Sequence, residues 1–193
     1  CYVTLNPENA LVREHIRAGG RAVALEGGVN GQMISLFDRG AHMPLLWTHL
    51  IPATLEGRAT HNVQNAMFAA GMAYAMGVKL DDIRHGLRTF DTTFFQAPGR
   101  MNIYDDHGFK VILDYGHNPA AVDAMCNLVD NLVAGGVLGK SGVRTCVLAV
   151  PGDRRNEDAV AMARRAARSF DRFICRQDDS LRGRKSGEMA NIV

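Results

Sequence analysis

The spacing of apolar residues changes repeatedly along the chain, and each change predicts a new element. Short apolar or alternating runs bounded by glycine, proline or polar residues are typical of strands, and they predict strands at residues 1–5, 21–26, 32–38, 45–51, 101–105, 109–114, 144–150 and 172–176. Apolar residues three and four apart predict helices, and these cover residues 6–18, 61–76, 80–90, 120–133 and 157–170. Asn6, with Pro7 after it, is the expected start of the first helix. The glycine-rich residues 27–31 predict a hairpin turn.

The order of these elements predicts an α/β protein in two parts. Residues 91–99 have neither period and indicate a linker, and we place the domain boundary between residues 94 and 95. Beyond it, strands alternate with helices, which favours a parallel sheet. The chain begins with Cys1 rather than Met and stops within the apolar stretch 190–193. We therefore expect it to be an internal piece of a longer protein, with the end of one α/β domain and most of a second, smaller one.

Charge and composition narrow the classes of function. The 22 basic and 20 acidic residues give a net charge of +2, which gives no reason to expect nucleic-acid or membrane partners. No apolar run approaches the roughly 18–20 residues of a membrane span. The four cysteines lie far apart, with no C-x-x-C pair, so we expect reduced thiols and a cytoplasmic location.

Residues 134–141, Ala-Gly-Gly-Val-Leu-Gly-Lys-Ser, nearly form a phosphate-binding loop. Such a loop requires a strand before it and a helix after it, because the amides of the helix N-terminus bind the phosphate. Here the predicted helix precedes and the predicted strand follows. We interpret the stretch as a helix-to-strand connection.

Two clusters of polar residues lie in the first half of the chain and around the linker. At a helix start, His61, Asn62 and Asn65 stand close together, and the two asparagines share a helix face. Amide side chains supply the donor and acceptor that an adenine edge requires, although helix capping explains them equally well. Arg100 follows Pro98-Gly99 at the end of the linker, either as a phosphate-binding guanidinium or as a solvated side chain after a turn.

Two further clusters follow predicted strands in the second part. Asp114, His117 and Asn118 lie between a strand and a helix, at the edge of an open α/β sheet where ligands usually bind; an Asp-capped turn with a hydrogen-bonded histidine is the alternative. Residues 152–158 and 178–184 each follow a strand, so a parallel sheet places them at that same edge. Their charged residues Asp153, Asp178, Asp179 and Arg182 suit a cationic substrate or Mg²⁺-bound groups, or are simply solvated.

Taken together, the motifs H-N-x-x-N-A, P-G-R-M and D-Y-G-H-N-P resemble those of the Mur ligases, over essentially the whole chain. Residues 5–9, 11–15, 151–155 and 178–184 resemble more narrowly the cyanophycin synthetase branch of that family. The resemblance implies that residues 1–94 are the C-terminal part of the central, ATP-binding domain. Residues 95–193 would be the Rossmann-like C-terminal lid domain, truncated at its end, with a mostly parallel sheet.

The resemblance also implies roles for single residues. Asn65 would contact adenine, with His61 and Asn62 shaping the same helix start. Arg100 would contact the nucleotide, Asp114 would engage the ribose or anchor the lid, and His117 and Asn118 would face the nucleotide and the reacting centre. The segment 178–184 would lie where related ligases hold the incoming amino acid. Gly116 departs from the family, which usually has Ala there.

The implied activity joins arginine to the aspartate side chain of a polymer primer, using ATP and Mg²⁺ through an acyl phosphate. The phosphate-binding loop, the metal ligands and the catalytic lysine would precede Cys1, so these 193 residues alone are expected to be inactive. We also expect a homo-oligomer in the full-length protein. Alternatives are a folylpolyglutamate or muramyl tripeptide synthetase, a synthetase that joins preformed dipeptides, or a non-catalytic nucleotide-binding or assembly module.

Overall fold

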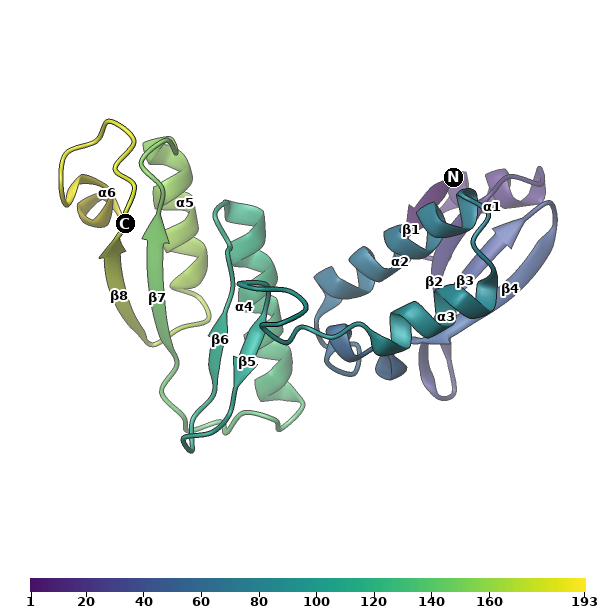
Figure 1. The fold of residues 1–193 in the computed structure, drawn as a ribbon, viewed down its shortest axis with the longest axis horizontal. Helices are drawn as coiled ribbons and strands as arrows, with labels where there is room; N and C mark the ends of the chain where they lie inside the picture. The colour runs from purple at the N-terminus through teal and green to yellow at the C-terminus, as the bar shows by residue number, and fades with distance from the viewer. The chain divides into compact units, whose positions relative to one another are not determined.

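The computed structural model describes all 193 residues. They form two compact units, Cys1–Leu113 and Asp114–Val193, which we describe separately. Both contain strands and helices (Figure 1), so the predicted α/β class is confirmed. The predicted boundary after residue 94 stays a prediction.

The first unit is built on a four-stranded sheet with the order β1-β2-β3-β4. β1 (Tyr2–Thr4) pairs in parallel with β2 (Ala22–Gly28), whereas β3 (Gly31–Asp38) and β4 (Ala41–Trp47) continue the sheet in antiparallel fashion. Gly28 pairs with Gly31 across a two-residue turn, so the predicted hairpin is confirmed.

Helices cover one face of this sheet. α2 (Thr60–Ala75) packs on β1 and β2, and α3 (Leu80–Thr89) packs on β4 (Figure 1). The helical period of α2 places small and apolar side chains on its inner face, where they meet the buried side chains of β2 and β3. The fully buried core includes Val23, Ile34, Leu36, Val63 and Met67.

Two elements of the first unit differ most from their predicted bounds, α1 (Ala10–Arg17) and β4. α1 is capped by Asn9, whose side chain accepts a hydrogen bond from the Val12 amide, whereas Asn6 accepts one from the Glu8 amide in the preceding turn. The strand predicted at residues 45–51 instead spans Ala41–Trp47, because its pairing with β3 begins at Asp38↔Ala41. Short 3₁₀ helices follow it, η1 (Thr48–Leu50) and η2 (Pro52–Thr54).

The linker carries no helix or strand up to β5 (Asn102–Tyr104). β5 pairs in antiparallel fashion with β6 (Val111–Leu113). This agrees with the two short strands and the turn predicted between them.

The second unit alternates helix and strand. Its elements are α4 (Pro119–Ala134), β7 (Thr145–Val150), α5 (Asn156–Ala166), β8 (Arg172–Gln177) and α6 (Glu188–Ile192). β7 and β8 are parallel, and α5 packs against α4, α6 and β7. α5 ends four residues before its predicted end, and α6 was not predicted. The stretch that resembles a phosphate loop connects α4 to β7, as predicted.

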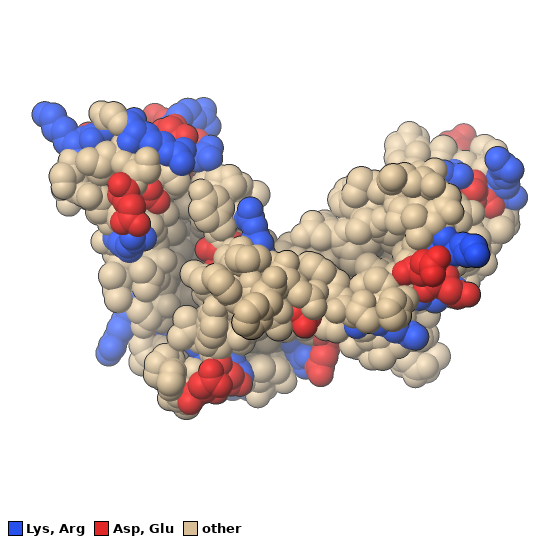
Figure 2. All heavy atoms as spheres, viewed as in Figure 1, with Lys and Arg blue, Asp and Glu red and all other residues tan.

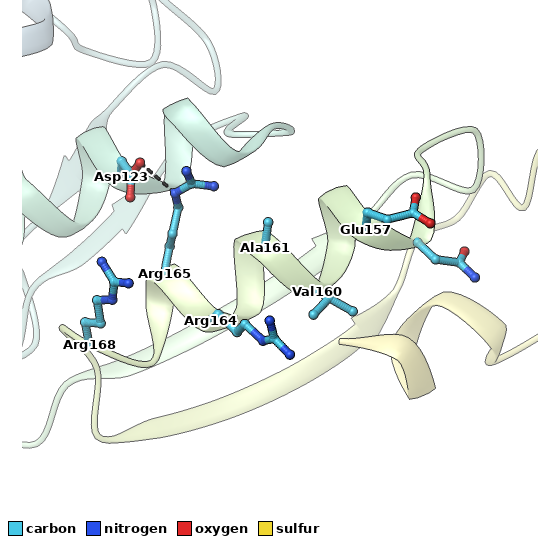
Figure 3. A pocket seen from close by; sticks show the side chains of 8 residues that line it. Asp123, Glu157, Val160, Ala161, Arg164, Arg165 and Arg168 are labelled. Carbon is cyan, nitrogen blue, oxygen red and sulfur yellow. Dashed lines mark ion pairs between the residues drawn. The ribbon is translucent and has the colours of Figure 1, made fainter.

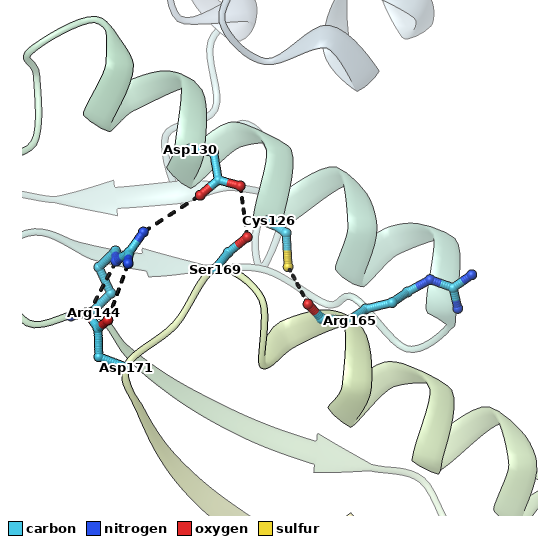
Figure 4. Close-up of polar contacts among 6 residues, drawn as sticks. All are labelled: Cys126, Asp130, Arg144, Arg165, Ser169 and Asp171. Carbon is cyan, nitrogen blue, oxygen red and sulfur yellow. Dashed lines mark hydrogen bonds and ion pairs between the residues drawn. The ribbon is translucent and has the colours of Figure 1, made fainter.

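A polar cluster fastens the amino ends of β7 and β8 to the helices (Figure 4). Asp171 accepts hydrogen bonds from the backbone N–H and guanidinium of Arg144, which lowers the pKa of Asp171. Asp130 of α4 accepts a 2.8 Å bond from the hydroxyl of Ser169, a side chain that is almost fully buried. Because buried polar groups need partners, we assign this cluster to the fold.

The distribution of surface charge and the state of the cysteines agree with what the composition predicted. On the face shown in Figure 2, basic and acidic side chains lie beside one another rather than forming a field of one sign. All four cysteines are free thiols, and burial raises the pKa of Cys146 to about 11. None of the helices is both long and apolar enough to cross a membrane.

Candidate functional site

The start of α2 presents an ordered pair of amides. The N-cap position is Ala59, and no side chain caps this helix, so the capping alternative for Asn62 and Asn65 is wrong. Asn62 donates 2.7 Å to the carbonyl oxygen of Ala53 and accepts 3.1 Å from Nδ2 of Asn65. Asn65 is exposed and its Oδ1 accepts no hydrogen bond. The arrangement fixes Asn65 through Asn62 and leaves one acceptor facing solvent, close to His61 in the first turn.

The turn that contains Arg100 lies against the same amide pair. Arg100 stands between Gly99, with a φ of 69°, and Met101, with a φ of 51°. A positive φ is unfavourable for methionine, yet the Met101 side chain is only 1% exposed. Its Sδ lies 3.7 Å from Nδ2 of Asn62. The structure thereby joins two of the predicted clusters, which are separated by 35 positions between Asn65 and Arg100, into one place in the first unit.

Asp114, His117 and Asn118 lie between β6 and α4, as predicted. Asn118 is the N-cap of α4, and its Oδ1 accepts 2.9 Å from the Ala121 amide. Nδ1 of His117 lies 3.1 Å from the carbonyl oxygen of Tyr115. The Oδ1 atom of Asn118 therefore caps the N-terminus of α4. A Cβ at Gly116 would lie 3.4 Å from Oδ1 of Asp114, so the alanine usual in the family almost fits here.

The loops after β7 and β8 meet at one edge, because parallel strands end on the same side of a sheet. Asp153 of the first loop forms an ion pair with Arg182 of the second. This contact lowers the pKa of Asp153 and raises that of Arg182, to which the charges of Asp178 and Tyr115 also contribute. The two loops that follow β7 and β8 thus meet at the ion pair of Asp153 and Arg182.

Arg184 holds these two loops together, and within the predicted segment 178–184 only its charge distinguished it. Its guanidinium donates 3.1 Å to the carbonyl oxygen of Gly152 and 3.0 Å to that of Arg154. A third bond, 2.7 Å long, goes to Glu188 in the first turn of α6. Since all three bonds use one planar group, the relative position of the two loops is well defined.

The three predicted acidic residues differ in what they already bind. Asp153 is paired with Arg182, and Asp179 with Arg176 at 2.7 Å. Oδ1 of Asp178 accepts 2.9 Å from the Ser180 amide, and Asp178 forms no ion pair. A cationic ligand would have to displace an arginine from Asp153 or Asp179. Asp178 is therefore the carboxylate at this edge that is available to such a ligand.

Gly152 is where the two loops touch most closely. A Cβ there would lie 2.0 Å from the carbonyl oxygen of Leu181, so Gly152→Ala requires a backbone shift. We expect it to lower the free energy of unfolding by about 1–3 kcal/mol, as overpacking does, measured by urea denaturation. The matched control is Gly139→Ala, where nothing lies within 4 Å. Equal stability of the two variants would contradict the contact.

A groove of about 610 Å³ runs along α5 and beside Asp123 of α4 (Figure 3). Glu157 lies at its N-terminal end, and Arg164, Arg165 and Arg168 at its C-terminal end. Acids near a helix N-terminus and bases near its C-terminus complement the helix dipole. Arg165 is also paired with Asp123 at 2.7 Å. We interpret the groove as a solvated helix face.

The structure brings together no group of three histidine, cysteine, aspartate or glutamate side chains that suits a metal ion. Mg²⁺ prefers several oxygen ligands in octahedral geometry. These 193 residues therefore do not by themselves fit a magnesium site.

Residues 99–193 match the family model "Mur ligase, glutamate ligase domain". The whole chain is 35% identical to cyanophycin synthetase of Crocosphaera subtropica and 37% identical to that of Trichormus variabilis. It spans about a fifth of the length of these relatives, 21% and 20%.

Among solved structures, folylpolyglutamate synthase of Thermotoga maritima matches 98% of this chain and 44% of its own, with a TM-score of 0.54 and 18% identity. At that identity the match supports the fold alone. Residues 99–193 therefore match the glutamate ligase domain of the Mur ligases, and the chain as a whole is similar to a part of the cyanophycin synthetases.

Proposed function

We propose that the chain is part of an ATP-dependent ligase that joins arginine to the aspartate side chains of a polymer. The observation that carries this proposal is its similarity to cyanophycin synthetases over the complete chain. That similarity includes the segment 178–184, where the resemblance to Mur ligases implies a site for the incoming amino acid.

The first unit supports a nucleotide-binding role. The free acceptor of Asn65 suits the exocyclic amine of adenine, which donates hydrogen bonds. Asn62 holds Asn65 in place and contacts Met101, the neighbour of Arg100. The Arg100 guanidinium, carried by the residue next to Met101, is of a type well suited to phosphate oxygens.

The second unit supports binding of a cationic amino acid. Arginine carries a planar cation whose burial is costly unless an acid pairs with it. Asp178 is available for that cation, whereas Arg182 and Arg184 hold the loops in place. His117, near the same edge, would face the reacting groups.

In the proposed reaction, ATP transfers its γ-phosphoryl group to the β-carboxylate of an aspartate at the polymer end, giving an acyl phosphate and ADP. The α-amino group of arginine then attacks the carbonyl carbon, loses a proton, and phosphate departs. Mg²⁺ would neutralise phosphate charge, held by residues outside this chain. The residues of this chain would orient the nucleotide and the amine and help to exclude water from the acyl phosphate.

The test uses the full-length protein that carries this sequence, with ATP, Mg²⁺ and a short aspartate–arginine primer. We expect arginine to be incorporated with one ADP formed per arginine. Incorporation of glutamate or diaminopimelate instead would favour another Mur-type ligase. Addition of preformed aspartate–arginine dipeptides, but not of arginine, would favour the dipeptide-joining synthetase. Nucleotide binding without any ligation would favour a non-catalytic module.

A further inference from the structure

The linker before β5 is folded around one buried amide. Asn102 is only 1% exposed although the surrounding segment has no helix or strand. Its Nδ2 donates to the carbonyl oxygens of Thr92, at 2.7 Å, and Ala97, at 2.9 Å. Its Oδ1 accepts 2.7 Å from the Gly99 amide. The donor group and the acceptor of this one side chain thus form hydrogen bonds to three backbone positions of the linker.

Arg100 lies inside the loop that these bonds close. Gly99, whose amide donates to Asn102, precedes Arg100, and the buried Met101 follows Arg100. The Arg100 amide itself donates 3.1 Å to Ala97, whose carbonyl oxygen Asn102 also binds. The positive φ of Met101 persists only where the surroundings hold it, and its buried side chain provides that hold. Gly99 adopts its positive φ without strain, and Asn102 fixes the position of the Gly99 amide.

We propose that Asn102 is a positioning residue for Arg100. It keeps residues 92–102 as a rigid loop, so that the Arg100 guanidinium starts from a fixed backbone beside the amide pair of α2. The segment predicted to be a plain linker is, in this view, a preorganised part of the nucleotide site. This inference rests on the proposed function only for the identity of the ligand, since the loop contacts do not depend on it.

The first test is kinetic and uses the full-length protein. Asn102→Asp keeps the shape and the acceptor but loses both donors, which leaves two carbonyl oxygens facing a carboxylate. We expect kcat/KM for ATP to fall about ten- to hundred-fold, equivalent to roughly 1.4–2.7 kcal/mol. In an Arg100→Ala background, the same change should lower kcat/KM less than about twofold further, because a residue that acts through Arg100 has nothing left to position.

Gln96→Ala is the matched control, because Gln96 is an exposed amide of the same loop that accepts a 3.3 Å bond from the Asp91 amide. We expect near-unchanged kinetics for it. If Asn102→Asp does not fold, the same comparison with and without Arg100 is made with Asn102→Ser, which keeps one hydroxyl group for hydrogen bonding. Equal losses in the presence and absence of Arg100 would overturn the proposal, because Asn102 would then act on stability alone.

The second test does not depend on catalysis. Hydrogen exchange of the Gly99 amide should be slow in the wild-type protein and at least about tenfold faster in Asn102→Ser. Unchanged exchange would overturn the proposal even if the enzyme is active. A slow Gly99 amide in a protein without ligase activity would instead refute the proposed function and leave the rigid loop standing.

Discussion

Replacing Arg100 or Asp114 by Ala is expected to lower arginine-adding turnover in the full-length enzyme by about two orders of magnitude or more. Arg100 would lose its contact to the nucleotide phosphates, and such a transition-state contact in a site closed to water is typically worth 100- to 1,000-fold. Asp114 begins the segment that leads to His117 and to the N-cap of α4, where it would engage the ribose or anchor the lid. Steady-state rates of ADP formation and arginine incorporation measure both.

Two exposed residues provide controls for these substitutions. Arg88→Ala removes an exposed arginine at the end of α3, and Asp106→Ala an exposed aspartate in the turn between β5 and β6. Both should keep wild-type turnover. If the full-length enzyme also adds aspartate to the polymer at a separate site, that addition should continue in both variants with an arginine-capped primer. An equal loss of arginine addition and aspartate addition would mean that Arg100 and Asp114 maintain the fold instead.

Strand and helix identities could be predicted because burial imposes a period on the sequence. α2, α3 and α4 occur within two residues of their expected bounds, since each has one face in a core. β8 does so as well, although all of its residues are exposed. The errors lie where local hydrogen bonds decide. Asn6 and Asn9 have the same chemistry, and only the observed bonds show which of them caps α1. The predicted bounds of β4 lay four residues too late, because the position of this strand depends on its pairing with β3. Apolar content alone does not reveal that pairing.

The positions of the site residues could be predicted, but not their partners. A parallel arrangement of β7 and β8 was enough to bring Asp153 and Arg182 to one edge. The pairing that neutralises Asp153 was not foreseeable, because the loops contain several acids and several arginines in similar positions. The structural roles of Asn102 and Arg184 were missed for a related reason. Neither a buried amide in a linker nor a guanidinium that bridges two loops produces a periodic pattern of apolar residues.

The sharpest test of substrate choice concerns the acids after β8. Asp178→Asn should raise the Michaelis constant for arginine much more than that for ATP. Loss of a charge-assisted contact costs about 1.5–3 kcal/mol, which corresponds to a roughly ten- to hundred-fold higher constant. The substitution keeps the shape of the side chain and the acceptor that holds the Ser180 amide, so the loop should stay folded.

Asp179→Asn is the comparison that separates recognition from general electrostatics. Asp179 is the next residue along the chain and carries the same charge, but it is 91% exposed and paired with Arg176. If the incoming guanidinium binds Asp178, the carboxylate without an ion-pair partner, Asp179→Asn should change the Michaelis constant for arginine by less than about fivefold, as expected for an exposed pair worth about 1 kcal/mol or less. A large effect of Asp179→Asn with none of Asp178→Asn would mean that arginine displaces Arg176. Normal arginine binding by both variants would show that the loop is only a solvated turn and that the amino acid is held elsewhere.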